Sequence, residues 1–312
     1  MTTGAQHLAA VREGGKPAVA HTLSRIEADR HADDVVALLD AAFADPVGHV
    51  IGLTGPPGVG KSTLTSALIQ AERADGRTVA VLAIDPSSQI TGGALLGDRT
   101  RLKNDPGDTG VFVRSMAARD RLGGLSEHAF AAAILFQALY DTVVVESVGV
   151  GQSEGDITLV SDTTLLAIQP GSGDSLQFMK AGIMELPDII AVTKADMGAA
   201  ARRAVADVEG ALSLAMAATP VHLVSANTGE GLDRLVSSLK SRSDGGHHQQ
   251  RRRRARAWVN QALRHSFGTF GADRSVALQK VAVHGDPSRT PFHTEKAHAL
   301  ALTLVFQSGP QP

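Results

Sequence analysis

The residues with the most evident chemistry lie in the stretch GPPGVGKST, which has the spacing G-x-x-x-x-G-K-[ST]. Its glycines let backbone N–H groups surround an anion, and a helix that follows adds unpaired N–H groups and a positive dipole end. Lys61 is placed to reach the β- and γ-phosphates of a nucleotide, and the Ser62 hydroxyl to ligate Mg²⁺. The residues predicted to bind the nucleotide here are Gly55, Pro56, Pro57, Gly58, Val59, Gly60, Lys61, Ser62 and Thr63.

Acidic residues at the ends of apolar runs are candidates for the metal site. Asp85 closes the run VAVLAI, and Glu146 closes the run TVVV. Asp85 is predicted to bind Mg²⁺ directly or through a water molecule. Glu146 has the position of the acid that senses the Mg²⁺ shell in phosphate-loop enzymes, where Asp is usual. Asp98, in the glycine-containing segment Thr91–Arg99, is a further metal candidate, and its alternative role is a helix N-cap.

The segment SVGVGQSE after Glu146 supplies candidates for hydrolysis. The small Gly149 would let its N–H approach the γ-phosphate, and Gln152 and Glu154 would orient the attacking water. A lone acid at a strand end would be ordinary. An acid that follows a phosphate loop and leads into a glycine-rich segment favours a catalytic role.

Two short motifs indicate which base is bound. Thr193, Lys194 and Asp196 form T-K-x-D, which resembles the guanine-reading N-K-x-D motif of GTPases. Asp196 would accept from the two donors of the guanine Watson–Crick edge, and the Lys194 stem would lie along the base. Thr193 replaces the usual Asn and leaves a hydroxyl there. A second motif, Ser225, Ala226 and Asn227, resembles the S-A-x loop whose backbone N–H contacts the guanine oxygen. Together they favour GTP and GDP over ATP.

An α/β fold must position these residues. From about His49 strands alternate with helices, which predicts a P-loop NTPase domain with a mostly parallel sheet covered on both faces. A nucleotide site in such a fold lies at the carboxyl ends of the strands. The predicted strands are Val50–Thr54, Thr78–Asp85, Val111–Met116, Thr142–Val148, Thr164–Gln169, Ile189–Thr193 and His222–Ser225. The predicted helices between them are Lys61–Ala74, Ser126–Leu139, Ser175–Ile183, Ala199–Ala215 and Gly231–Ser241.

The remaining segments divide the chain into three parts. Residues 1–45 are predicted to be a helical extension and residues 46–240 the nucleotide-binding domain. Residues 241–312 begin as a polar linker and continue as the helix RRRRARAWVNQAL. Its basic face fits a subunit or partner contact better than RNA, because no aromatic interleaving or RNA module accompanies it. Residues 266–312 are expected to be irregular.

Composition narrows the function classes. The 312 residues carry a formal net charge of −2, so no global basic field favours nucleic acid. Cysteine is absent, which excludes disulfides, thiolate zinc sites and cysteine nucleophiles and suits a reducing cytoplasm. The first residues lack the pattern of a signal peptide, and no apolar run approaches the ~18 residues needed to cross a bilayer. We therefore expect a cytoplasmic protein without a membrane partner.

The assembled stretches resemble the MeaB/ArgK-type GTPases, which include the human methylmalonic aciduria type A protein. The resemblance covers roughly His49–Leu239 and rests on GPPGVGKST, AIDPSSQITGGALLGDRTR, VVVESVGVGQSE, PGSGDSLQFMKAGIMELPDIIAVTKAD and SANTGEG. It implies a GTPase chaperone of an adenosylcobalamin-dependent acyl-CoA mutase, usually methylmalonyl-CoA mutase, that gates cofactor loading and protects or rescues the mutase. The family has also been described as a transport kinase, and nothing in the chain supports a protein kinase.

The resemblance also assigns roles to particular residues. Segment Gly171–Lys180 is similar to the family's extra switch loop, with Asp174, Gln177 and Lys180 at its matching positions. This similarity implies that Lys180 carries the partner's signal to the nucleotide. It further implies a homodimer formed through a C-terminal helical arm, which here would begin at Gln249–Leu263.

Two other functions compete with this interpretation. A nickel-insertion GTPase of the urease or hydrogenase type would share the fold, but such proteins usually carry Cys or His ligands near their switch loops. This chain has no Cys, and its His residues are scattered. A non-catalytic nucleotide-binding scaffold is the second alternative. Intact Lys61, Ser62, Asp85 and Glu146 argue against it.

Overall fold

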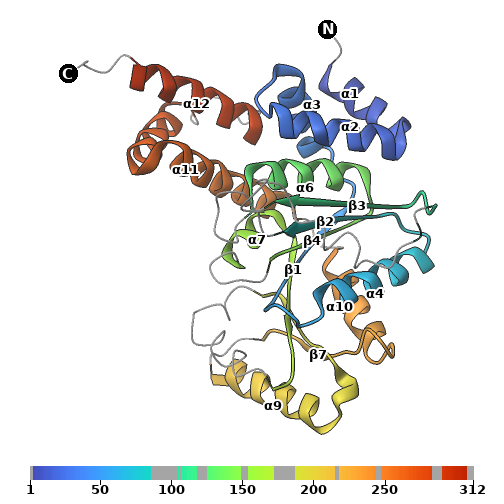
Figure 1. Ribbon diagram of the computed structural model, residues 1–312. Coiled ribbons are helices and arrows are strands. Elements are labelled where there is room, and N and C mark those ends of the chain that lie inside the picture. The colour runs from blue at the N-terminus through green and yellow to red at the C-terminus, as the bar shows by residue number, and fades with distance from the viewer. Residues whose placement is uncertain are drawn as a thin grey trace, which may run out of the picture. The chain divides into compact units, whose positions relative to one another are not determined.

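The computed structural model divides the chain into two compact units (Figure 1). One unit spans Val47–His247, and the other combines Met1–Pro46 with His248–Pro312. The structure describes residues 3–85, 105, 107–117, 125–148, 154–171, 187–214, 218–243, 247–282 and 290–307.

A seven-stranded sheet, in the order β3-β2-β4-β1-β5-β6-β7, forms the centre of the first unit. All of its strand pairs are parallel, which confirms the predicted P-loop α/β fold. The strands are β1 (His49–Thr54), β2 (Val79–Asp85), β3 (Val111–Ala117), β4 (Thr142–Glu146), β5 (Thr163–Ile168), β6 (Ile189–Val192) and β7 (Val221–Leu223). Four strands end earlier than predicted, so Ser147, Gln169, Thr193 and Ser225 lie beyond the carboxyl ends.

Alternating side chains of the strands fill two apolar layers. On one face Leu165 and Ala167 of β5 join a core that includes Leu68 of α4 and Leu235 of α10. On the opposite face Leu166 and Ile168 join Val208 of α9. Because helices cover both faces, the strands read as continuous apolar runs. The helices of this unit are α4 (Lys61–Ala74), α6 (Glu127–Leu139), α7 (Glu154–Val160), α9 (Ala199–Leu214) and α10 (Leu232–Ser243), with α4 beside α10 (Figure 1).

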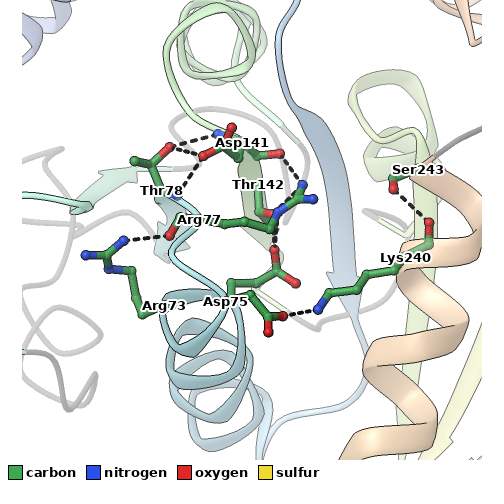
Figure 2. A network of polar contacts seen from close by, with 9 residues as sticks. Arg73, Asp75, Arg77, Thr78, Asp141, Thr142, Lys240 and Ser243 are labelled. Atoms are coloured by element: carbon green, nitrogen blue, oxygen red, sulfur yellow. Dashed lines mark hydrogen bonds and ion pairs between the residues drawn. The ribbon is translucent and has the colours of Figure 1, made fainter.

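A polar network connects the amino ends of strands β2 and β4, at the opposite end of the strands from the phosphate loop (Figure 2). The Thr78 backbone N–H and hydroxyl both donate to Asp141 Oδ2, at 2.8 and 2.7 Å, and Arg77 donates to Asp141 O at 3.1 Å. Thr142 donates to the buried Glu72 of α4 at 2.5 Å. Burial acts to raise the pKa of Asp141, but the Thr78 hydrogen bonds and the Arg77 charge outweigh it and lower that pKa. The network therefore anchors α4 to the starts of β2 and β4.

The second unit is helical in its described residues. It contains α1 (Gly4–Glu13), α2 (Gly15–Ala28), α3 (Asp33–Ala44), α11 (His248–Ala282) and α12 (Pro291–Gln307). The expectation of an irregular segment at 266–312 is wrong, because α11 continues to Ala282, with a kink at Gly268 (φ 66°), and α12 follows. Helix α12 packs against α3 and α11.

The buried side of α12 explains why periodicity did not reveal it. Its buried residues include Phe292, Glu295, His298 and Leu302, and two of these are polar. Arg30, in the connection between α2 and α3, pairs with Glu295 at 2.5 Å. The two side chains are only 8% and 5% exposed. Burial acts to raise the pKa of Glu295, but hydrogen bonds and charges from His31 and Arg30 outweigh it and lower that pKa. Glu295 and Arg30 are thus buried as an ion pair, whereas an apolar residue would be expected on the buried side of α12.

Candidate nucleotide-binding site

The phosphate loop joins β1 to α4 through three glycines with positive φ. Gly58 and Gly60 have φ of 76° and 97°, which residues with a side chain rarely adopt. A Cβ on Gly55 would lie 2.3 Å from the Ala167 carbonyl oxygen, so only glycine fits beside β5. Lys61 is 8% exposed, and its Nζ donates to the carbonyls of Gly55 at 2.8 Å and Pro56 at 3.2 Å. The loop therefore holds its own cation close to the backbone that is predicted to bind phosphate.

Two residues predicted for the metal site are in contact, and a third ends a neighbouring strand. Ser62 at the start of α4 donates to Glu146 Oε1 at 2.8 Å. Glu146 and Asp85, 4% and 1% exposed, end the neighbouring strands β4 and β2. A hydroxyl and two buried carboxylates are hard oxygen donors of the kind that Mg²⁺ prefers, so these residues fit that ion. Asp98 lies outside the described residues.

Sequence reasoning missed Thr65 as a part of this site. Thr65 is completely buried, and its hydroxyl donates to Glu146 Oε2 at 3.0 Å. Ser62 and Thr65 stand three positions apart on α4 and so share one face of the helix. Each of the two Glu146 oxygens is therefore held by a different hydroxyl. The sequence shows a second hydroxyl three residues after Ser62, but its role appears only when Glu146 is seen beside it.

We expect Thr65→Val to weaken the Mg²⁺-dependent part of nucleotide binding by about tenfold, because it leaves a buried carboxylate oxygen without this donor. Valine keeps the shape of threonine, and Thr65→Ser, which keeps the hydroxyl, is the matched control. The measurement is calorimetric titration with GDP in Mg²⁺ and in a chelator. Equal Mg²⁺ dependence in the Val variant and the wild type would contradict this role for Thr65.

The two motifs that are predicted to read the base lie side by side beyond β6 and β7. Ser225 is 1% exposed and its hydroxyl donates to Asp196 Oδ1 at 2.7 Å, while Asp196 itself is exposed. Ala195 N–H donates to Val224 O at 3.0 Å and joins the two loops. The backbone N–H of Ser225 donates to Glu230 O at 2.9 Å. Within the site, Ser225 therefore contributes its hydroxyl, which orients the carboxylate predicted to read guanine.

Thr193 connects the T-K-x-D motif to the phosphate loop. Its hydroxyl lies 2.8 Å from Val59 O and 3.1 Å from Ile168 O, and its side chain is buried. The Lys194 ammonium donates to Gly58 O at 3.1 Å. Thr193 stands where Asn is usual, and its hydroxyl hydrogen-bonds the phosphate loop. The residues predicted to bind phosphate are thus linked to those predicted to bind the base.

Several predicted residues are not placed. Gly149, Gln152 and Lys180 lie outside the described residues, as does the helix predicted over 175–183. Glu154 begins α7. Ala226 and Asn227 follow Ser225 in the turn before α10.

Comparison with known proteins now identifies the family. A family model described as methylmalonyl-CoA mutase-associated GTPase MeaB matches residues 18–269. The chain belongs to the MeaB family. A putative GTPase of Pyrococcus horikoshii is 46% identical over 187 residues, which cover 60% of this chain and 59% of that relative. This chain therefore spans less than two thirds of the relative's length.

Two solved structures are similar to this chain in fold. One described as a LAO/AO transport system kinase covers 98% of both chains with a TM-score of 0.65 and 26% identity. HypB from Helicobacter pylori, solved in complex with nickel, has a TM-score of 0.52 and 16% identity over 69% of this chain and 94% of its own. At that identity the HypB comparison shows a shared fold alone. Among the residues that the structure describes, no group of three His, Cys, Asp or Glu side chains could hold a metal ion.

None of the helices in the described ranges combines the length and the apolar character that crossing a bilayer demands.

Proposed function

We propose that the protein binds and hydrolyses GTP and serves as a chaperone of an adenosylcobalamin-dependent acyl-CoA mutase, with methylmalonyl-CoA mutase as the first candidate. The observation that carries the proposal is the set of contacts linking the phosphate loop to both other parts of the site. Ser62 bonds Glu146, and Thr193 bonds Val59 beside the Asp196–Ser225 pair. This arrangement, in a member of the MeaB family, supports a guanine nucleotide as the substrate.

Each residue has a part in the proposed hydrolysis. The Lys61 ammonium offsets charge on the phosphates, and the loop N–H groups hold them. Ser62, Asp85, Asp98 and Glu146 would hold Mg²⁺, and Glu146 also accepts the hydrogen bond from the Ser62 hydroxyl. When bound, Mg²⁺ would neutralise the charge that develops on the transferred phosphoryl group.

Three further residues are assigned to the γ-phosphate and the attacking water. The Gly149 N–H is proposed to contact the γ-phosphate, and Gln152 and Glu154 to orient the water for attack in line with the leaving group. These contacts would be lost when the γ-phosphate leaves. Loss of the phosphate would in this way change the interactions of the segment that follows β4.

Coupling to the partner is proposed to run through Gly171–Lys180. This segment follows β5, which carries Ala167 beside the phosphate loop at Gly55. A cytoplasmic homodimer completes the proposal, with α11 and α12 as the candidate arm. The match to the family model ends at residue 269 within α11.

We expect the isolated protein to hydrolyse GTP slowly and purified methylmalonyl-CoA mutase to accelerate it by ~10³-fold or more, since a charge supplied in trans can raise phosphate-loop hydrolysis by that order. Lys180→Ala should lose the stimulation and keep the slow basal rate. The measurement is phosphate release with and without the mutase, and Lys16→Ala on α2 is the control. A fully stimulated Lys180→Ala protein would refute the role of this segment, and an unstimulated wild type would refute the mutase as partner.

A further inference from the structure

Lys194 is held in a backbone conformation that favours glycine. Its φ is 58°, and among the described residues other than glycine it alone has a positive φ. Such a conformation is unfavourable for a side-chain-bearing residue and persists where surrounding contacts fix it. Two such contacts flank it, because Thr193 N–H donates to Ile168 O at 2.8 Å and Met197 N–H donates to Lys194 O at 2.9 Å.

Gln169 meets the Lys194 side chain from the end of β5. Its Oε1 accepts from Lys194 Nζ at 2.5 Å, and Gly58 O accepts from the same ammonium at 3.1 Å. Strands β5 and β6 pair up to Ile168 and Val192, so Gln169 is the first residue beyond the paired region. Neither the phosphate-loop motif nor the T-K-x-D motif includes position 169, so neither motif explains the amide side chain there.

We propose that Gln169 is a positioning residue of the guanine site, which fixes Lys194 so that its stem covers the face of the base. The inference rests on the proposed binding of GTP and adds a residue that none of the sequence motifs assigns. A lysine side chain has several rotatable bonds, and ordering it on nucleotide binding costs entropy. Two acceptors that hold the ammonium before the nucleotide arrives remove part of that cost.

The identity of the acceptor fits this role. A carboxylate at position 169 would also accept from Lys194, but it would add a negative charge near the phosphate loop. The Gln169 amide fixes the ammonium and leaves the net positive charge of Lys194 in place. Gly58 is itself part of the phosphate loop, so Lys194 links the side-chain amide to the backbone that binds phosphate.

The test is a double-mutant cycle on nucleotide affinity. Gln169→Met keeps the side-chain length and removes the acceptor, and we expect it to weaken GDP binding by about tenfold through faster release. Gln169→Glu keeps an acceptor for Lys194 but adds a negative charge near the phosphate loop, so its loss of GDP affinity should shrink at high salt, whereas the loss in Gln169→Met should not. If Gln169 acts through Lys194, Gln169→Met should have little further effect in a Lys194→Met background. Full additivity of the two substitutions would overturn the inference.

Two further arms separate positioning from general damage and from failure of the proposed function. Inorganic triphosphate with Mg²⁺ lacks a base, so its binding should be the same in Gln169→Met and in the wild type. An equal loss for triphosphate and GDP would show damage to the phosphate loop and overturn a role at the base. Wild-type protein that binds ADP as tightly as GDP would refute the guanine site itself, whatever the cycle gives.

Discussion

Replacing Lys61 with alanine is expected to lower GTP hydrolysis by at least about 10³-fold and to weaken GTP binding. The ammonium is the charged side chain that the loop itself supplies, and charge stabilisation dominates phosphoryl transfer. The substitution also removes the donor that lies 2.8 Å from Gly55 O and 3.2 Å from Pro56 O. The measurement is single-turnover hydrolysis together with the affinity for a non-hydrolysable GTP analogue.

The Lys61 experiment needs controls for packing and for charge in general. Lys61→Met keeps most of the buried stem and removes the charge, so it should match the alanine variant in hydrolysis while melting closer to the wild type. Lys240→Ala removes a cation of α10 that pairs with Asp75, and it should leave hydrolysis unchanged. Wild-type turnover by Lys61→Ala would place the chemistry elsewhere in the chain.

Asp196→Asn is expected to exchange guanine preference for xanthine preference, with GDP affinity falling by about 10²-fold or more. A carboxylate accepts from two donors on the guanine edge, whereas xanthine presents one donor and one acceptor, which an amide matches. A site built around hydrogen bonds discriminates strongly, because the wrong base leaves polar groups unpaired. The Ser225 hydroxyl, 2.7 Å from Asp196 Oδ1, can donate equally to the amide oxygen of Asn.

Competition between GDP, xanthosine diphosphate and ADP measures this exchange. Asp188→Asn is a matched control, because Asp188 precedes β6 and pairs with Arg242 at 3.0 Å, at the opposite end of the strand from Asp196. The control should keep guanine preference. An Asp196→Asn protein that still prefers GDP, or a wild type that binds GDP and ADP equally, would contradict the assignment of the base.

The fold of the nucleotide-binding unit was predictable because its signals are local. Helix α4 has the predicted bounds, and each predicted strand is present within a few residues. The phosphate-loop spacing and the acids at strand ends also follow from residues close in the sequence. Parallel strands then bring Asp85 and Glu146 to neighbouring ends of one sheet, so the chemistry at that edge could be expected without the structure.

The features that were missed depend on partners distant in the sequence. Gln169 becomes informative only when Lys194, 25 positions away, is seen beside it, and Thr65 only beside Glu146, 81 positions away. Helix α12 was missed because its buried face uses Glu295, whose partner Arg30 is 265 positions away. Apolar periodicity records burial of hydrocarbon and so overlooks a buried ion pair.

The separation of Arg30 from Glu295 also sets an order of events during synthesis. At about 5 to 20 residues per second, 265 residues take roughly 13 to 53 s to be added. The whole of Val47–His247 is translated within that interval, and it forms a compact unit. We therefore expect Val47–His247 to fold first. The N-terminal helices α1 to α3 complete their packing only after α12 has been made. Helices α1 to α3 are made before Val47–His247 and α12 is made after it, so the unit that they share becomes complete after the other.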